Sequence, residues 1–378
     1  MSDTAPTNGP ITPITPITPI TPMTPMTPMT PMTPITPVPP VSVPGDVFAS
    51  ASGGGAARLA APSLEAVNRW IRLARPQLLL LGLAPTIATL ALLWINGAHL
   101  LAVPAVFSVV AVVLAQSGAN VLDEYVEFER ARRAGAVAGV LGAGDAGALL
   151  AASGIVPLNA LRAGIGLLIA GALAGIPLAI SGGAGVALLG AFGLGAAFLY
   201  SSTTYALKRL PGGEVVVFLA LGPGVATAVA LAQRTRVSGP VLLAGCALGL
   251  LTLALLVAAS FSSQERDKLL GRRALVSYLG VGGSRALYTI CLAGAFALVA
   301  LLALPKGAPY GALAVLLALP AALVALTGML RARNTSARGL IPRQTYRVYA
   351  LFALWLVVGL LASGIVARLV TLALGNGS

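Results

Sequence analysis

Three carboxylates near residue 125 are spaced so that they could act together. The sequence there reads Asn120-Val-Leu-Asp123-Glu124-Tyr125-Val-Glu127. On a continuing helix, Asn120, Asp123 or Glu124, and Glu127 share one face, because i, i+3/i+4 and i+7 positions are neighbours. Ionisable groups at the end of an apolar helix are costly unless they pair or bind a metal. The motif therefore indicates an ion-pairing or metal-binding site.

A second polar motif follows a later apolar run and contains Ser263, Glu265 and Asp267. Ser263 and Asp267 are i, i+4 partners, whereas Glu265 lies on another face. Two facing helix ends that carry carboxylates can hold Mg²⁺, which prefers oxygen ligands and retains substrate phosphates. A pyrophosphate bridged by Mg²⁺ becomes a good leaving group. The pair of motifs predicts magnesium-assisted chemistry on a diphosphate.

Lys208 and Arg209 lie between these motifs in the polar segment 200–214 and could take the remaining phosphate charge. Taken singly, each of the three segments is better explained as a solvated loop at the membrane surface. Together, on one side of a membrane, they indicate an anion–metal site.

The elements that position these residues are membrane helices. Hydrophobic residues make up 57% of the 378 residues and charged residues only 9%, whereas soluble domains carry about 25% charged residues. A bilayer span needs roughly 20 apolar residues. Nine stretches meet or approach this length: 77–97, 100–122, 160–181, 183–203, 213–233, 240–261, 286–304, 309–329 and 349–371. The sequence predicts an all-α bundle of nine transmembrane helices.

The basic residues orient this bundle. With the N-terminus inside, 20 of the 24 Lys and Arg residues fall on the inner side, which is the cytoplasmic side by the positive-inside rule. This bias explains the net charge of +13 without nucleic acid. All 11 acids fall on the same side or in the N-terminal tail, although acids contribute little to orientation. We therefore expect an integral protein of the cytoplasmic membrane with its active-site face cytoplasmic.

Residues 1–63 have a different composition. Residues 11–37 are nine Ile-Thr-Pro or Met-Thr-Pro repeats, and 45–63 are rich in Gly, Ala and Ser. Proline at every third position excludes helix and sheet ladders, so an extended, disordered tail and linker is expected. The tail is a spacer, upstream sequence from a misassigned start, or a proline-rich docking segment. Cys246 and Cys291 lie in apolar runs and are interpreted as buried hydrophobes.

Several segments together resemble the UbiA-superfamily prenyltransferases, and within them the 1,4-dihydroxy-2-naphthoate polyprenyltransferases of menaquinone synthesis. Trp70-Ile-Arg-Leu-Ala-Arg75-Pro76 is similar to the family's segment before the first span. The motif at 120–127 is similar to its Asn-x-x-Asn-Asp-Tyr-x-Asp, and Tyr205-Ala-Leu-Lys208 with 213–223 to its middle segment. The most specific match is Phe261-Ser-Ser-Gln-Glu-Arg-Asp-Lys-Leu-Leu-Gly271. The resemblance covers about residues 69–370.

The resemblance implies a prenyltransferase-like domain over residues 64–378 that transfers a polyprenyl group from its diphosphate to an aromatic acceptor, with Mg²⁺ as cofactor. It implies that Asp123, Glu124, Glu127 and Asp267 are metal ligands. Lys208, Arg209 and Arg272 would balance the diphosphate, and Asn120 would contact substrate. Asp123, Glu127, Lys208 and Asp267 would carry catalysis. Tyr125 and Tyr205 either line the acceptor pocket or anchor the chain at the membrane surface.

The chain also departs from the family pattern. Ser263 stands where the family has the first aspartate of its second acidic motif, and Arg133 where an aspartate often closes the first. Two alternatives to the naphthoate enzyme therefore remain: a related enzyme with another aromatic or lipid acceptor, and a non-catalytic lipid- or quinone-binding protein. A transporter is disfavoured because the predicted spans carry no mid-membrane charge, apart from Arg368 near the C-terminus. Prenyl length and oligomeric state are left open by the sequence.

Overall fold

The computed structural model describes residues 64–133, 147–200, 207–210, 212–264, 267, 275–304 and 309–375. Within these ranges the chain is helical and contains no strand, as the predicted all-α class requires. The predicted tail, residues 1–63, lies outside the described residues.

The helices follow one another with short connections. In the first half they are α1 (Leu64–Leu73), the 3₁₀ turn η1 (Pro76–Leu79), α2 (Leu80–Ile95), α3 (Ala102–Arg133), α4 (Ala148–Ser153), α5 (Pro157–Gly182) and α6 (Ala184–Tyr200). In the second half they are η2 (Leu207–Arg209), α7 (Gly213–Leu219), η3 (Ala220–Gly224), α8 (Val225–Ala232), α9 (Gly239–Ser262), α11 (Leu275–Leu302), η4 (Tyr310–Ala318), α12 (Leu319–Arg331) and α13 (Thr335–Gly375).

Eight helical segments in the described part of the chain are long and apolar enough to cross a membrane. They coincide with eight of the nine predicted stretches. The remaining stretch forms α6, which is apolar but has only 17 residues. The span 213–232 is interrupted by the π-helical turn η3, which contains Gly222-Pro223. Such interruptions are tolerated where neighbouring helices satisfy the freed backbone groups.

Small residues allow the helices to pack closely. At the α3–α5 contact, a methyl group on Gly118 would lie 2.9 Å from the carbonyl oxygen of Gly164. The largest hydrophobic core joins α2, α9, α11, α12 and α13, and α9 is the most deeply buried span. Bulky side chains elsewhere, such as Ile180 and Leu188, point outward, which suits a surface that faces lipid. Close contact between helix backbones therefore stabilises the bundle. Burial of apolar surface gives no driving force between helices that already lie in lipid.

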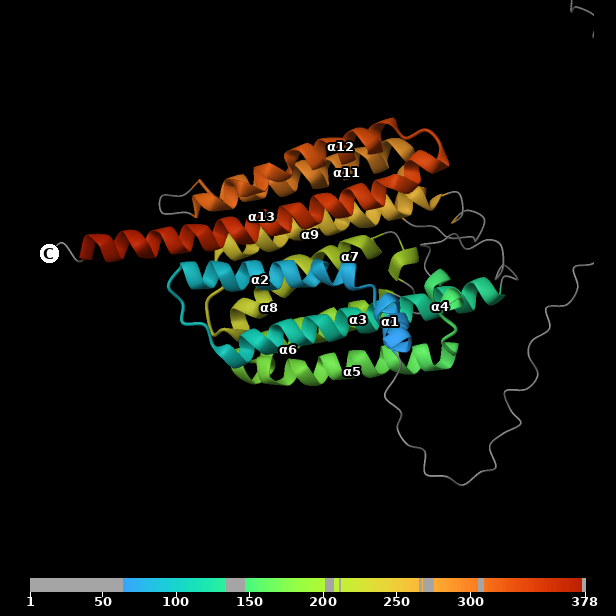
Figure 1. Ribbon diagram of the computed structural model, residues 1–378, viewed down its shortest axis with the longest axis horizontal. Coiled ribbons are helices and arrows are strands. Elements are labelled where there is room, and N and C mark those ends of the chain that lie inside the picture. The colour runs from blue at the N-terminus through green and yellow to red at the C-terminus, as the bar shows by residue number, and fades with distance from the viewer. Residues whose placement is uncertain are drawn as a thin grey trace, which may run out of the picture. The chain divides into compact units, whose positions relative to one another are not determined.

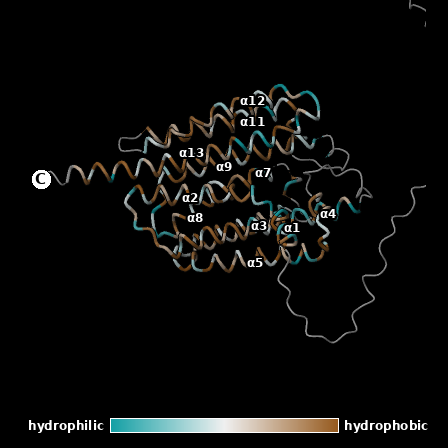
Figure 2. Tube along the Cα trace, in the orientation of Figure 1, coloured by the Kyte–Doolittle hydropathy of each residue, from teal (hydrophilic) through white to brown (hydrophobic). Residues whose placement is uncertain are grey.

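Helix α3 is longer than a bilayer crossing. Its 32 residues extend about 48 Å at 1.5 Å per residue, whereas the hydrocarbon core is about 30 Å thick. The last turns, which carry the first acidic motif, therefore project beyond the apolar part of the bundle. The C-terminal ends of α3 and α9 and the N-terminal ends of α7 and α11 lie at the same end of the bundle (Figure 1, right). Hydrophilic residues concentrate around α1 and α4 at this end (Figure 2).

Candidate functional site

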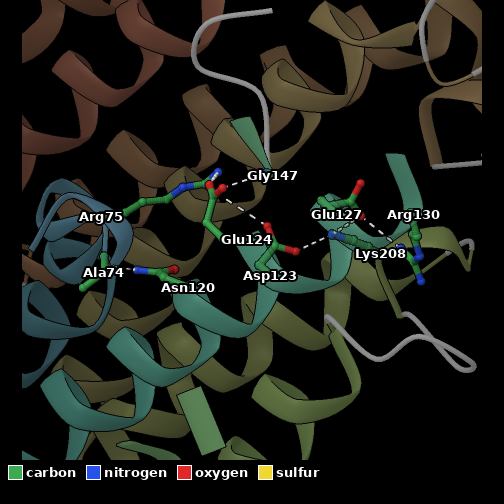
Figure 3. Close-up of polar contacts among 9 residues, drawn as sticks. All are labelled: Ala74, Arg75, Asn120, Asp123, Glu124, Glu127, Arg130, Gly147 and Lys208. Atoms are coloured by element: carbon green, nitrogen blue, oxygen red, sulfur yellow. Dashed lines mark hydrogen bonds and ion pairs between the residues drawn. The ribbon is translucent and has the colours of Figure 1, made fainter. Parts of the chain in front are cut away.

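The last turns of α3 present the predicted polar residues on two faces. Positions i and i+4 lie above one another on a helix, so Asn120 pairs with Glu124 and Asp123 with Glu127. The first pair meets the segment before α2, and the second pair meets Lys208 of η2 (Figure 3). The structure thus divides the single face expected from the sequence into two faces with different partners.

The first face anchors the chain before α2. Asn120 Nδ2 donates to the carbonyl oxygen of Ala74 at 2.8 Å, and the Arg75 guanidinium forms an ion pair with Glu124. Gln116 continues the same face by donating to a carbonyl of η1 at 2.6 Å. Arg75 itself has a φ of 50°, a left-handed conformation that is uncommon for residues other than glycine. These three contacts fix the turn from α1 into α2.

Gly147 completes the surroundings of Glu124. Its backbone N–H donates to Glu124 Oε2 at 2.7 Å, while Oε1 accepts from Arg75. Gly147 has a φ of 88°, and a methyl group there would lie 2.6 Å from the backbone nitrogen of Phe128. Glycine is therefore required both by conformation and by its close approach to α3. Because Glu124 is fully buried and both its oxygens have partners, the geometry favours a structural role for it.

The second face forms the candidate active site. Lys208 Nζ lies 2.7 Å from Glu127 Oε1 and forms an ion pair with Asp123. Arg130 Nη1 approaches the same Glu127 oxygen at 3.0 Å, and Arg75 Nη1 lies 3.7 Å from Asp123 Oδ2. Lys208 and Asp123 are each 15% exposed at the side chain, whereas Glu127 is 2% exposed. Lys208 and Asp123 are thus more accessible than Glu127.

Among the described residues, the ion pairs of this cluster join equal numbers of acids and bases. Three carboxylates of α3 face three cations, which come from α3 itself, from η2 and from the turn before α2. Removing one member of such a buried pair typically costs about 3–5 kcal/mol, because the other charge is left unpaired. An anionic ligand that draws Lys208 away therefore needs a compensating cation beside Asp123 and Glu127.

In the second acidic motif, Ser263 and Asp267 form hydrogen bonds with each other. Ser263 Oγ donates to Asp267 Oδ2 at 2.6 Å, and the Asp267 amide donates to the Ser263 carbonyl at 2.8 Å. Asp267 is 5% exposed. The residue that replaces the family's aspartate thus acts as a donor to the remaining one. An aspartate at position 263 would place a second carboxylate beside Asp267 and would remove the hydrogen bond that Ser263 donates to it.

The oxygen donors suit Mg²⁺ by their chemistry, which is hard carboxylate coordination. The Lys208 ammonium lies between Asp123 and Glu127, so both carboxylates face a positive charge at this point. Among the described residues, no group of three or more His, Cys, Asp or Glu side chains is arranged to hold a metal. The expected joint site of the α3 acids and Asp267 therefore stays a prediction, with Asp123 and Glu127 as its best-placed ligands.

Other residues predicted for the site have different positions. Tyr125 packs with a small cluster that includes Leu73 and Leu150. Arg209 ends η2, one residue after Lys208. Tyr205 and Arg272 lie outside the described residues, as does Glu265 of the second motif.

The sequence-based site missed four residues: Arg75, Arg130, Gly147 and Glu214. Arg75 was visible as part of the Arg-Pro motif, but nothing local indicated its contact with α3. Arg130 could have been found as the i+3 partner of Glu127. Glu214 is 2% exposed, in the first turn of α7, and a buried acid within an apolar run is itself a signal.

The fold and this cluster define an integral membrane protein, an α-helical bundle with an acid–base site at one end. The profile of the UbiA prenyltransferase family matches residues 82–340. The chain belongs to this family, as the sequence resemblance predicted.

One curated relative agrees with this assignment, and two solved structures share the fold. The chain is 31% identical over 241 residues to a 1,4-dihydroxy-2-naphthoate octaprenyltransferase of Mycobacterium tuberculosis, covering 63% of this chain and 79% of the relative. The fold resembles a UbiA homolog from Archaeoglobus fulgidus bound to DMAPP and Mg²⁺, with a TM-score of 0.54, 15% identity, and coverage of 78% of this chain and 99% of the other. A structure of digeranylgeranylglyceryl phosphate synthase matches with a TM-score of 0.53, 16% identity, and coverage of 79% and 100%.

Proposed function

We propose that the protein transfers a polyprenyl group from its diphosphate to 1,4-dihydroxy-2-naphthoate, a step of menaquinone biosynthesis. The observation that carries the proposal is the cluster of Lys208 with Asp123 and Glu127 in a chain of the UbiA family. The naphthoate acceptor is supported by the 31% identical mycobacterial relative.

The side chains at the end of α3 have distinct tasks in this reaction. Lys208 is 15% exposed and carries its charge on a flexible stem, so it can leave Asp123 and bind the diphosphate oxygens. Arg209 and Arg272 are proposed to take the remaining phosphate charge. Asp123 and Glu127, with Asp267 from the second motif, would hold Mg²⁺. Once bound, Mg²⁺ would neutralise the diphosphate and make it a better leaving group.

The remaining contacts hold these groups in place. Arg75 and Gly147 fix Glu124, and Arg130 keeps Glu127 oriented when Lys208 moves away. Asn120 and Glu124, predicted as substrate and metal contacts, are better explained as anchors of the turn before α2. The apolar bundle would bind the prenyl tail and exclude the water that would otherwise quench an allylic cation. Tyr125 and Tyr205 remain candidates for the acceptor pocket.

The membrane arrangement is part of the proposal. We assign the apolar helix α6 as the ninth span, the membrane as the cytoplasmic one, and the end with the cluster as the cytoplasmic face. The tail, residues 1–63, is assigned as a dispensable spacer and 64–378 as the catalytic domain.

The test is a membrane assay with labelled prenyl diphosphate and several acceptors, read by mass spectrometry with and without EDTA. The proposal expects a magnesium-dependent prenylated naphthoate. Product with another acceptor alone would support the related enzyme. Absence of turnover with every acceptor would support the non-catalytic lipid- or quinone-binding protein, which the serine at position 263 favours.

A further inference from the structure

Glu214 is a buried acid that the proposed mechanism leaves unused. It lies in the first turn of α7, is 2% exposed, and its Oε2 has no hydrogen-bond partner within the described ranges. Three backbone amides lie close to its carboxyl group: its own, that of Leu275, where α11 begins, and that of Gly212. One carboxylate oxygen therefore lies in a polar position without a donor.

The turn before α7 holds Glu214 beside the proposed active site. A methyl group on Gly213 would lie 3.2 Å from the backbone nitrogen of Lys208 and would overlap the carbonyl of Leu207. The backbone of 213 is therefore packed directly on η2. At the end of α6, Tyr200 interacts electrostatically with both Asp123 and Glu214. Glu214 and the α3 cluster thus belong to one polar region.

An unpaired oxygen of this kind is costly. A buried acceptor that lacks a donor loses the hydrogen bonds that it makes with water in the unfolded chain. An acid inside a membrane segment is by default a candidate functional group, because ionisable residues there are rare. The missing donor is readily supplied by a bound molecule.

The chemistry of the possible ligands selects among them. A fully ionised diphosphate offers only acceptor oxygens, and a prenyl tail has no polar group, so neither can donate a hydrogen bond to Glu214. Mg²⁺ is assigned to Asp123, Glu127 and Asp267 in the proposed mechanism, which leaves Glu214 without that role. The hydroxyl groups of an aromatic acceptor remain, since an O–H donates a strong, short hydrogen bond to a carboxylate.

We infer that Glu214 binds the aromatic acceptor by accepting a hydrogen bond from a ring hydroxyl at Oε2. This inference rests on the proposed function, since it assumes a hydroxylated aromatic acceptor. It assigns the acceptor to the α7 side of the polar region and the diphosphate to the Lys208 side. A carboxylate at this position would select hydroxylated rings over their methyl ethers.

The test compares 1,4-dihydroxy-2-naphthoate with 1,4-dimethoxy-2-naphthoate, which keeps the ring and carboxylate but cannot donate from the ring oxygens. Binding of each to the purified full chain is measured by calorimetry without prenyl diphosphate, for wild type, Glu214→Gln and the control Glu65→Gln. Glu65 is an exposed acid of α1, so its variant removes one charge away from the site. Wild type and the control should prefer the dihydroxy compound by about tenfold or more, as expected for a hydrogen bond to a charged group.

In Glu214→Gln this preference should fall to about threefold or less, while KM for the prenyl diphosphate stays unchanged. An unchanged preference, or equal binding of both naphthoates by wild type, would overturn the inference. If Glu214→Gln does not accumulate, Glu214→Asp must retain the preference, and its loss there would assign Glu214 a structural role. If wild type shows the preference but no turnover, the acceptor site stands and the proposed function fails.

Discussion

Replacing Ser263 by aspartate tests the second acidic motif most directly. In the wild-type chain, Ser263 Oγ donates to Asp267 Oδ2 at 2.6 Å. In Ser263→Asp this donor becomes a second carboxylate on the adjacent helical turn. We expect the variant to be less stable than wild type without divalent cation and to bind Mg²⁺ more tightly, because added negative oxygen ligands favour a hard cation.

Two effects set the loss of stability expected for Ser263→Asp without divalent cation. Loss of a hydrogen bond to a charged group costs about 1.5–3 kcal/mol. Two carboxylates about 4 Å apart repel by about 4 kcal/mol at an effective dielectric constant of about 20. Position 263 is half-buried, so solvent and side-chain rotation reduce the second effect. A net destabilisation of about 3 kcal/mol follows, which Mg²⁺ at about 100 times its Kd would largely offset, with about 2.7 kcal/mol.

The assay is thermal unfolding in detergent with EDTA or Mg²⁺, followed by a Mg²⁺ titration of product formation. The variant should unfold several degrees below wild type in EDTA and recover in Mg²⁺, and it should reach half-maximal turnover at a lower Mg²⁺ concentration. Ser262→Asp is the matched control, because Ser262 Oγ donates to the Ala259 carbonyl on another part of the helix. Equal Mg²⁺ requirements for variant and wild type would refute the interpretation that Ser263 weakens metal binding at this motif, and inactivity of both would favour the non-catalytic protein.

Three further predictions follow from the same structure. Asp123→Asn and Asp267→Asn should each reduce turnover at least about 100-fold at normal accumulation, and near-normal activity of either would remove that residue from the proposed metal site. Gly147→Ala should destabilise the chain by about 2 kcal/mol or more, since it combines a left-handed φ with a methyl group against α3; a thermal midpoint equal to wild type would contradict this packing. A chain that starts near residue 60 should insert and turn over like the full chain, because the repeats cannot offset the entropy of ordering; a large loss of activity at equal expression would give the tail a role.

The membrane helices could be predicted because the signal for each is local. A span must bury about 20 apolar residues in lipid whatever its neighbours are, and eight such segments are present in the described chain. The exception, α6, carries the same apolar composition in 17 residues. The composition alone also excluded a soluble fold.

The candidate site was only partly visible in the sequence. The i, i+4 relations within α3 and between Ser263 and Asp267 follow from helix geometry. Residue types and their spacing were therefore sufficient to predict that these side chains share a helix face. Which residues meet Asp123 and Glu124 depends on segments far away along the chain: Lys208 lies 85 positions from Asp123, and Arg75 lies 49 positions from Glu124.

Tertiary packing therefore decided which acidic residues are held by structural contacts and which are available to a ligand. The close backbone approach at Gly147 and the turn at Arg75 give Glu124 two partners, which separates it from Asp123 although the two are adjacent in sequence. The same packing leaves Glu214 buried with an unpaired oxygen. The position of Glu214 beside an apolar run is visible in the sequence, but the partners of Glu124 and Glu214 are not, because a side chain's partners are set by which helices pack together rather than by its own neighbours along the chain.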